Sequence, residues 1–204
     1  MPQYDAVIIG AGVTGCAAAR ALSRYAGRFL VLERAGDLCE GASKANSAII
    51  HAGFDARPGS WKARMNVQGS RMMDRLAEEL DVPFRRNGAL VACLSEEGLP
   101  RLRALYDRGR ENGVEGLSLL TGAEARALEP NLTGQVCGAL LAETSGIVCP
   151  FELTLGLGEN AAHNGVCFLF DAQVTGLCQT EGGWTLETTR GPVTARAVVN
   201  AAGV

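Results

Sequence analysis

The stretch that decides the fold is Tyr4-Asp5-Ala6-Val7-Ile8-Ile9-Gly10-Ala11-Gly12-Val13-Thr14-Gly15, close to the start of the chain. The apolar run before Gly10 is typical of a buried strand in a parallel sheet. Gly10 permits a tight turn, Gly12 lets the backbone approach a pyrophosphate, and Gly15 lets the next helix pack close to the strand. The pattern therefore predicts a dinucleotide-binding turn between a strand and a helix.

An acidic residue follows at the distance that this motif requires. Residues 13–25 are rich in alanine and predict a helix, and residues 29–32 predict a second strand. Glu33 ends that strand, where a carboxylate can accept hydrogen bonds from ribose hydroxyls. The same charge disfavours a ribose 2′-phosphate and so argues against NADP.

The other end of the chain supplies a matching element. It reads Ala197-Val198-Val199-Asn200-Ala201-Ala202-Gly203 and predicts a strand that returns to the same nucleotide. The turn after the first strand does not by itself separate nicotinamide from flavin, but the two ends together indicate a flavin. A plain NAD dehydrogenase would not require the returning strand.

Composition excludes several classes of protein. The chain has 204 residues, of which 47% are hydrophobic, and a net charge of −3, so nothing draws it to nucleic acid. It has no apolar stretch of about 18 residues, so we expect no transmembrane segment. Because it shows no basic region followed by an apolar one at its start, we expect a cytoplasmic protein rather than a secreted one.

The seven cysteines do not follow a metal-binding pattern. Their spacings match neither zinc nor iron–sulfur sites, and we expect no metal. Small buried hydrophobic side chains are the favoured interpretation, and a redox-active disulfide is the functional alternative. Of the two histidines, His163 lies near the end of a predicted helix, where it would complement the helix dipole.

The order of the predicted elements is a βαβ unit, a mixed insertion and strands that return. The expected strands are 48–51, 89–94, 136–142, 166–170, 173–178, 184–188, 193–195 and 197–200, and the expected helices are 61–79, 96–112, 124–128 and 151–164. In helix 61–79, Met65, Met72, Leu76 and Leu80 are expected to face the core. The glycine turn at the end would normally lead into more structure, so we expect an N-terminal part of a longer protein.

Several segments together resemble one known superfamily. They are the glycine turn with Glu33, the segment Gly41-Ala42-Ser43-Lys44-Ala45-Asn46-Ser47-Ala48-Ile49-Ile50-His51-Ala52-Gly53, the segments 57–64 and 143–150, and the returning strand. The chain resembles the D-amino-acid-oxidase-like FAD-dependent oxidoreductases along its whole length. Within them it is most similar to anaerobic-type glycerol-3-phosphate dehydrogenases and L-2-hydroxyglutarate oxidases.

The resemblance implies an α/β fold with a Rossmann-like FAD-binding domain of the glutathione-reductase-2 type. Residues 1–82 and 146–204 would form the FAD-binding domain, and 83–145 would be part of an inserted α+β substrate region. The implied cofactor-binding residues are Gly10, Gly12, Gly15, Glu33, Arg34, Ser43, Lys44, Asn46, Ser47, Val174, Ala202 and Gly203. The hydroxyl, amide and ammonium groups of segment 43–47 are hydrogen-bond donors, which suit the phosphate and polyol oxygens of FAD.

His51 is the one catalytic residue that the resemblance implies. A histidine beside the flavin could take a proton from a hydroxyl or hold a substrate oxyanion while hydride leaves carbon. Packing against the flavin without a chemical role is the alternative. The aerobic glycerol-3-phosphate dehydrogenases carry an arginine shortly after the matching histidine. Here that place reads Gly53-Phe54-Asp55, which counts against a phosphate-bearing substrate.

The leading hypothesis is an enzyme that oxidises a CH–OH group of a small anionic substrate by hydride transfer to FAD. Glycerol 3-phosphate is the first choice, L-2-hydroxyglutarate the second and an amine the third. A module that only binds FAD is the hypothesis from another class, and this stretch alone is expected to be inactive. The anaerobic relatives also imply an electron-acceptor subunit as a partner.

Overall fold

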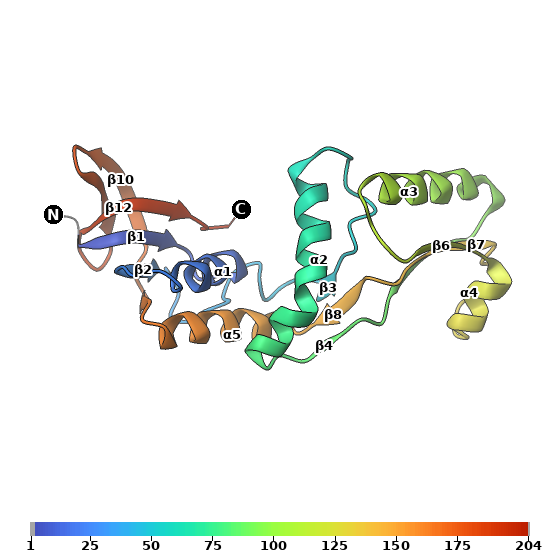
Figure 1. The fold of residues 1–204 in the computed structure, drawn as a ribbon, viewed down its shortest axis with the longest axis horizontal. Helices are drawn as coiled ribbons and strands as arrows, with labels where there is room; N and C mark the ends of the chain where they lie inside the picture. Colours follow the sequence, from blue (N-terminus) through green and yellow to red (C-terminus); the bar gives the residue numbers. More distant parts are fainter. Residues whose placement is uncertain (1–2, 204) are drawn as a thin grey trace. The chain divides into compact units, whose positions relative to one another are not determined.

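The computed structural model describes residues 3–203, which form two compact units. Unit 1 contains the residues up to 47, residues 80–82 and the residues from 149 onward, and unit 2 contains residues 48–79 and 83–148. The chain therefore leaves unit 1, builds unit 2 and returns (Figure 1). Among residues 3–203, no helix is both long and apolar enough to cross a bilayer.

Unit 1 is built on a six-stranded sheet with the order β10-β11-β12-β1-β2-β9. Strands β12, β1, β2 and β9 are parallel, and β10, β11 and β12 form antiparallel hairpins. Ile9 at the end of β1 pairs with Asn200 of β12 and Leu32 of β2, so three strands end at one edge. The strands are β1 (Tyr4–Ile9), β2 (Phe29–Leu32), β9 (Cys167–Leu169), β10 (Val174–Thr180), β11 (Gly183–Thr188) and β12 (Val193–Asn200).

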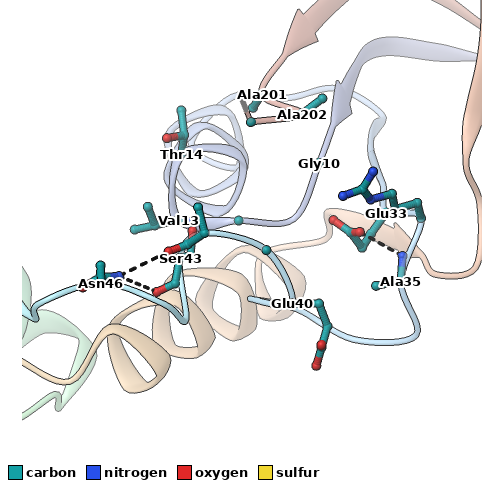
Figure 2. Close-up of a pocket in the computed structure, with 15 residues that line it drawn as sticks. Gly10, Val13, Thr14, Glu33, Ala35, Glu40, Ser43, Asn46, Ala201 and Ala202 are labelled. Atoms are coloured by element: carbon teal, nitrogen blue, oxygen red, sulfur yellow. Dashed lines mark hydrogen bonds between the residues drawn. The ribbon is translucent and has the colours of Figure 1, made fainter.

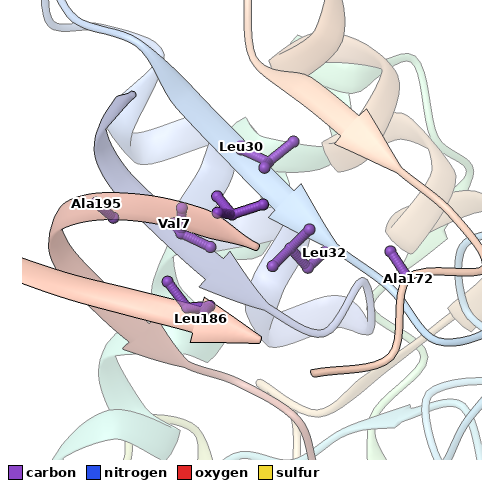
Figure 3. Close-up of a cluster of buried hydrophobic side chains, with 7 residues drawn as sticks. Val7, Leu30, Leu32, Ala172, Leu186 and Ala195 are labelled. Carbon is purple, nitrogen blue, oxygen red and sulfur yellow. The ribbon is translucent and has the colours of Figure 1, made fainter. Parts of the chain in front are cut away.

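Both faces of the central strands are buried. On one face Val7, Leu32 and Leu186 are nearly inaccessible and form the cluster drawn in Figure 3. On the other face Ile8 lies beneath α1 (Val13–Leu22), which packs on α5 (Pro150–His163). Burial on both sides explains why β2 is an uninterrupted apolar run rather than an alternating one.

Unit 2 contains two antiparallel three-stranded sheets, β3-β8-β4 and β5-β7-β6. Helix α3 covers one face of the β5-β7-β6 sheet and helix α4 covers the other (Figure 1). Leu102 of α3 packs with Cys93 and Leu140, and Ala125 of α4 packs with Ala139. The strands are β3 (Ile49–Ile50), β4 (Phe84–Arg85), β5 (Ala89–Cys93), β6 (Leu117–Thr121), β7 (Gly138–Ala142) and β8 (Gly146–Val148). The helices are α2 (Trp61–Leu80), the 3-10 turn η1 (Glu96–Gly98), α3 (Leu99–Glu111) and α4 (Gly122–Leu128).

The α/β fold and most of the elements expected from sequence are confirmed. The strands β4, β6 and β8 were not predicted, and the segments 193–195 and 197–200 are one strand, β12. The helix expected over 13–25 ends at Leu22, and the first turn of the one expected over 96–112 is η1. The expected boundaries of the functional domains, at 82–83 and 145–146, stay a prediction.

The buried face of α2 differs from the expected one. Met65 and Met72 are 48% and 62% exposed, so the prediction that they face the core is wrong. The residues that are buried instead are Ala63, Val67, Ser70, Met73 and Ala77. These mostly small side chains follow helical spacing and let the helix approach its neighbours closely, which a search for large apolar residues overlooks.

Candidate functional site

A cavity of about 540 Å³ lies in unit 1 at the edge where β1, β2 and β12 end (Figure 2). Four segments line it: the glycine turn with the start of α1, the end of β2, the loop that contains Glu40 and Asn46, and the turn after β12. Ligands of open α/β sheets bind at this edge, outside the carboxyl ends of the strands. The position therefore makes the cavity the candidate site.

The glycine turn is as tight as the sequence predicts. Gly10 has a φ of +101°, and a Cβ atom there would lie 2.5 Å from the carbonyl oxygen of Ala201. A Cβ atom on Gly15 would lie 1.9 Å from the carbonyl oxygen of Gly10. Gly15 thus supports the turn from behind and does not line the cavity, whereas Gly10 and Gly12 do.

A hydroxyl from a distant loop meets the start of α1. The helix begins after Gly12, which has no side chain to cap it, and Ser43 Oγ accepts the N–H of Val13 at 2.9 Å. Asn46 Nδ2 donates to the carbonyl oxygen of Ser43 at 2.8 Å and holds this loop in place (Figure 2). A helix N-terminus with free N–H groups and a hydroxyl beside it favours an anion such as a phosphate.

Glu33 ties the glycine turn to the end of β2. Its Oε2 accepts the N–H of Ala11 at 2.7 Å, and its Oε1 accepts the N–H of Ala35 at 2.9 Å. A carboxylate has about four acceptor positions, so this half-buried group can still accept hydrogen bonds from a ligand in the cavity. Sequence reasoning found the residue but not its structural role.

A second cavity of about 140 Å³ shares part of this lining. Glu33, Arg34 and Ala202 border both cavities, and Val174 at the start of β10 borders the smaller one. Ala202 and Gly203, in the turn after β12, line the larger one. Segments from both ends of the chain therefore meet around one site, as the sequence pattern predicts.

Besides Gly15, two of the expected residues are not part of the cavity lining. Lys44 forms an ion pair with Glu40, and both side chains are well exposed. Ser47 is exposed and borders neither cavity. Of the loop residues named from sequence, Ser43 and Asn46 are the ones that the structure brings to the larger cavity.

His51 belongs to unit 2 and is exposed directly after β3. The loop that follows it is fixed by side chains of α3 and of its C-cap. Asn112 Nδ2 donates to the carbonyl oxygens of Gly53 at 2.9 Å and Ala56 at 2.8 Å, and Arg108 Nη1 donates to that of Asp55 at 3.1 Å. Sequence reasoning missed Asn112, because no local pattern links it to a loop more than 50 residues away.

The comparisons with known sequences give one family. The DAO family, described as FAD dependent oxidoreductase, matches residues 5–204. A glycerol 3-phosphate dehydrogenase of Caloramator mitchellensis is 40% identical over 99% of this chain and 42% of its own length. A mitochondrial L-2-hydroxyglutarate dehydrogenase of Nematostella vectensis is 32% identical over 94% of this chain and 43% of its own length. The chain thus spans less than half the length of these curated relatives.

Solved structures agree with the family. A glycine oxidase from Geobacillus kaustophilus superposes with a TM-score of 0.91 at 30% identity and covers all of this chain and 56% of its own. A dithionite-reduced L-alpha-glycerophosphate oxidase from Mycoplasma pneumoniae, with FAD bound, has the same TM-score at 27% identity and covers all of this chain and 55% of its own. Because enzymes named for an amine and for an alcohol match equally well, the fold alone does not choose the substrate.

Proposed function

This chain belongs to the DAO family of FAD-dependent oxidoreductases, and on that premise we propose that the two cavities of unit 1 hold the ADP half of FAD. The fit rests on the site itself. Gly10 and Gly12 line the cavity with bare main chain, an added Cβ atom would lie 2.5 Å from Ala201 O at the first and 2.9 Å from Ser43 Oγ at the second, and a carboxylate stands at the end of β2. The cavity at the start of α1 suits a pyrophosphate, and the adjoining smaller one suits adenine.

Each residue of the lining has a role in this proposal. Gly10, Gly12 and Ser43 bind the pyrophosphate, and Glu33 accepts hydrogen bonds from the ribose. Arg34 and the backbone of Val174 border the adenosine, Asn46 orders the loop of Ser43, and Ala202 and Gly203 close the site from the side of β12. Lys44 and Ser47 would lie farther along the ligand, with Lys44 exchanging Glu40 for a phosphate.

When bound, FAD supplies the acceptor for a hydride from the substrate. We propose that His51 takes the proton of the substrate hydroxyl while the C–H bond breaks. Its exposure leaves the imidazole accessible, and the bonds from Asn112 and Arg108 fix the backbone of the loop that follows it. A loop held in this way keeps a proton acceptor in one place through the reaction.

We propose oxidation of a CH–OH group, with glycerol 3-phosphate as the first substrate and L-2-hydroxyglutarate as the second. Each substrate is the one named for a curated relative of this chain. The glycerol 3-phosphate dehydrogenase is 40% identical to this chain and the L-2-hydroxyglutarate dehydrogenase 32%, which favours the first. The segment Gly53-Phe54-Asp55 stands where the aerobic glycerol-3-phosphate dehydrogenases carry an arginine, which counts against a phosphate-bearing substrate and favours the second. An amine is the third choice.

Three further expectations are part of the proposal. Residues 1–82 and 146–204 serve FAD binding, and 83–145 belong to the substrate region. The seven cysteines are all free thiols, which supports a reducing compartment such as the cytoplasm. Resemblance to anaerobic-type dehydrogenases supports a partner subunit that accepts the electrons.

Anaerobic mixing of the full-length flavoprotein with each substrate tests the proposal. Bleaching of the visible flavin absorption by glycerol 3-phosphate, and not by L-2-hydroxyglutarate, is the expected result. Bleaching by L-2-hydroxyglutarate alone would select the second substrate, and bleaching by an amine alone would reject both alcohols. A flavin that dithionite reduces but no substrate does would identify a module that only holds FAD.

The variant His51→Gln tests the catalytic role. It should retain FAD and bleach about 10²- to 10⁴-fold more slowly with the preferred substrate. His163→Gln is the matched control, because His163 is exposed in α5 and its Nδ1 contacts the carbonyl oxygen of Glu159 in the same helix. Equal rates for the two variants would show that His51 carries no proton in the reaction.

A further inference from the structure

Two cysteines meet at one end of the β5-β7-β6 sheet of unit 2. Cys93 is the last residue of β5, and Cys137 directly precedes β7. The N–H of Cys137 donates to the carbonyl oxygen of Cys93 at 2.9 Å, and the thiol of Cys137 donates to the same oxygen at 3.2 Å. The two residues are 44 positions apart in sequence and adjacent in the sheet.

The two side chains share one apolar surface. Cys93 is 9% exposed and is buried with Leu102 and Leu140, and Cys137 is half-buried against the same cluster. The Cys93 thiol donates to the carbonyl oxygen of Ser95 at 3.1 Å, and a Cβ atom on Gly98 would lie 2.4 Å from its sulfur. Both thiols are thus confined to the face of the sheet that α3 covers.

The thiols also interact with each other. The pKa of Cys137 is raised by burial, by a hydrogen bond with the Cys93 thiol and by the negative charge of Glu96. The Cys137 thiol is therefore protonated at neutral pH, and each reduced thiol has a carbonyl oxygen as its hydrogen-bond acceptor. The Cys93 thiol is close enough to Cys137 to affect its ionisation.

The backbone hydrogen bond keeps the two residues within reach of a covalent bond. The residue directly opposite Cys93 in β7 is Gly138, and opposite residues of antiparallel strands have Cα atoms about 4.5–5.5 Å apart; Cys137 is the next residue along the chain from Gly138. A disulfide needs Cα atoms about 4.4–6.8 Å apart. The other cysteines offer a contrast: Cys16 and Cys39 are fully buried, with the pKa of Cys16 raised to about 12, whereas Cys149, Cys167 and Cys178 are exposed.

We propose that Cys93 and Cys137 form a modification site at which hydrogen peroxide, or another hydroperoxide, converts two thiols into one disulfide. Cys137 is the more exposed, so its sulfur loses its proton and attacks a peroxide oxygen. The O–O bond breaks, one water leaves and a sulfenic acid remains. The sulfur of Cys93 then attacks that of Cys137, the S–O bond breaks, and the second water leaves with the Cys93 proton.

This reaction transfers two electrons from the thiols to the peroxide, which becomes two waters. The bond would join the end of β5 to the start of β7 and close a loop that contains α3, β6 and α4. Because the raised pKa of Cys137 lowers its thiolate fraction, we expect slower oxidation there than at exposed Cys149. The proposal is independent of the substrate that the flavin site oxidises.

Peptide mapping of the native protein tests the proposal. The protein is treated with hydrogen peroxide, its free thiols are blocked with N-ethylmaleimide, and it is digested with trypsin and Glu-C. The sequence places Cys93 as the only cysteine in fragment 87–96 and Cys137 as the only one in fragment 127–143. We expect these fragments to be joined, lighter by two hydrogen masses than their sum, and separated again by dithiothreitol.

Matched variants complete the test. Cys149→Ser should keep the joined fragments, and Cys137→Ser should lose them while Cys93 stays blockable by maleimide after unfolding. If Cys137→Ser does not fold, the wild-type protein and Cys149→Ser still decide the question. Two separately blocked thiols in the oxidised wild type, or joined fragments that pair either cysteine with another one, would overturn the proposal.

Discussion

Unit 1 forms its cavity largely from main chain, whereas unit 2 fixes the loop after His51 with side chains. In unit 1 the decisive contacts are between Gly15 and Gly10 and between Gly10 and the turn at Ala201. In unit 2 the amide of Asn112 and the guanidinium of Arg108 bind three loop carbonyls. A turn whose glycines are in direct backbone contact therefore tolerates no added atom, whereas a loop held by side-chain hydrogen bonds loses stability one bond at a time.

The largest loss of stability is expected from a substitution at Gly15. The variant Gly15→Ala places a methyl group 1.9 Å from the carbonyl oxygen of Gly10, so the turn and α1 must separate. We expect a loss of about 3 kcal/mol in the free energy of unfolding, at the upper end for overpacking, and loss of bound flavin. Urea unfolding and the flavin content of the purified protein measure both.

Gly41→Ala is the control for this variant. Gly41 borders the same cavity, but a Cβ atom there meets nothing within 4 Å. Its free energy of unfolding should stay within about 0.5 kcal/mol of wild type. Equal losses of stability in the two variants would show that the contact between Gly15 and Gly10 is not what makes glycine necessary at position 15.

The parts that sequence reasoning predicted are those with local signals. Glycine spacing, an acid at a strand end and an apolar run are each contained within about 20 residues, and they placed Gly10, Glu33 and Ala202 at one cavity. Strands β4 and β8 have only two and three residues and pair with each other far along the chain, so no local alternation marks them. Asn112 is a helix C-cap, and nothing nearby in sequence indicates which carbonyls it binds.

The next effect is expected at Asn112. The variant Asn112→Ala removes the donors for the carbonyl oxygens of Gly53 and Ala56, which should cost about 1–3 kcal/mol. Faster hydrogen exchange across residues 52–57 is the second expected result, because the loop loses its attachment to α3. The exposed Asn87→Ala is the control, and an exchange rate in Asn112→Ala equal to that of this control would contradict the attachment.

A smaller effect is expected at Ser43, the one side chain that caps the cavity helix. Without its hydroxyl the N–H of Val13 loses its acceptor, and Ser43→Ala should destabilise the flavin-free protein by about 1 kcal/mol. Ser47→Ala, four residues on and exposed, should change the stability by less than half of that. Equal stabilities of the Ser43→Ala and Ser47→Ala variants would contradict a stabilising hydrogen bond between Ser43 and the start of α1.

The smallest expected change in stability comes from the Asp74–Arg86 ion pair on the surface of unit 2, and it depends on pH. Two hydrogen bonds from Arg86 Nε, at 3.0 and 2.8 Å, lower the pKa of the Asp74 carboxyl below its usual range. A lowered pKa gives stability that is complete above the ordinary value of about 4 and is lost as the pH falls through the folded value. Because the Asp74 side chain is 61% exposed, solvent screening keeps the contribution below about 1 kcal/mol.

Chemical unfolding of the Asp74→Asn variant over a pH series measures how much the Asp74 carboxylate contributes to the free energy of unfolding. The variant should be less stable than wild type near neutral pH and equal to it in strong acid, where the wild-type carboxyl is protonated. Glu78→Gln, on the same helix and exposed, should follow wild type throughout. A deficit in Asp74→Asn that persists unchanged into strong acid would show that the charge on Asp74 contributes nothing.

Recognition of the ADP half of FAD by the unit 1 site is the property on which the proposed function depends. Calorimetric titration of the flavin-free protein with FAD and, separately, with FMN measures it, because FMN carries the flavin without the adenosine. We expect FAD to bind with one-to-one stoichiometry and FMN to bind at least about 100-fold more weakly, a difference of about 2.7 kcal/mol. Equal affinity for the two flavins would contradict recognition of the ADP half.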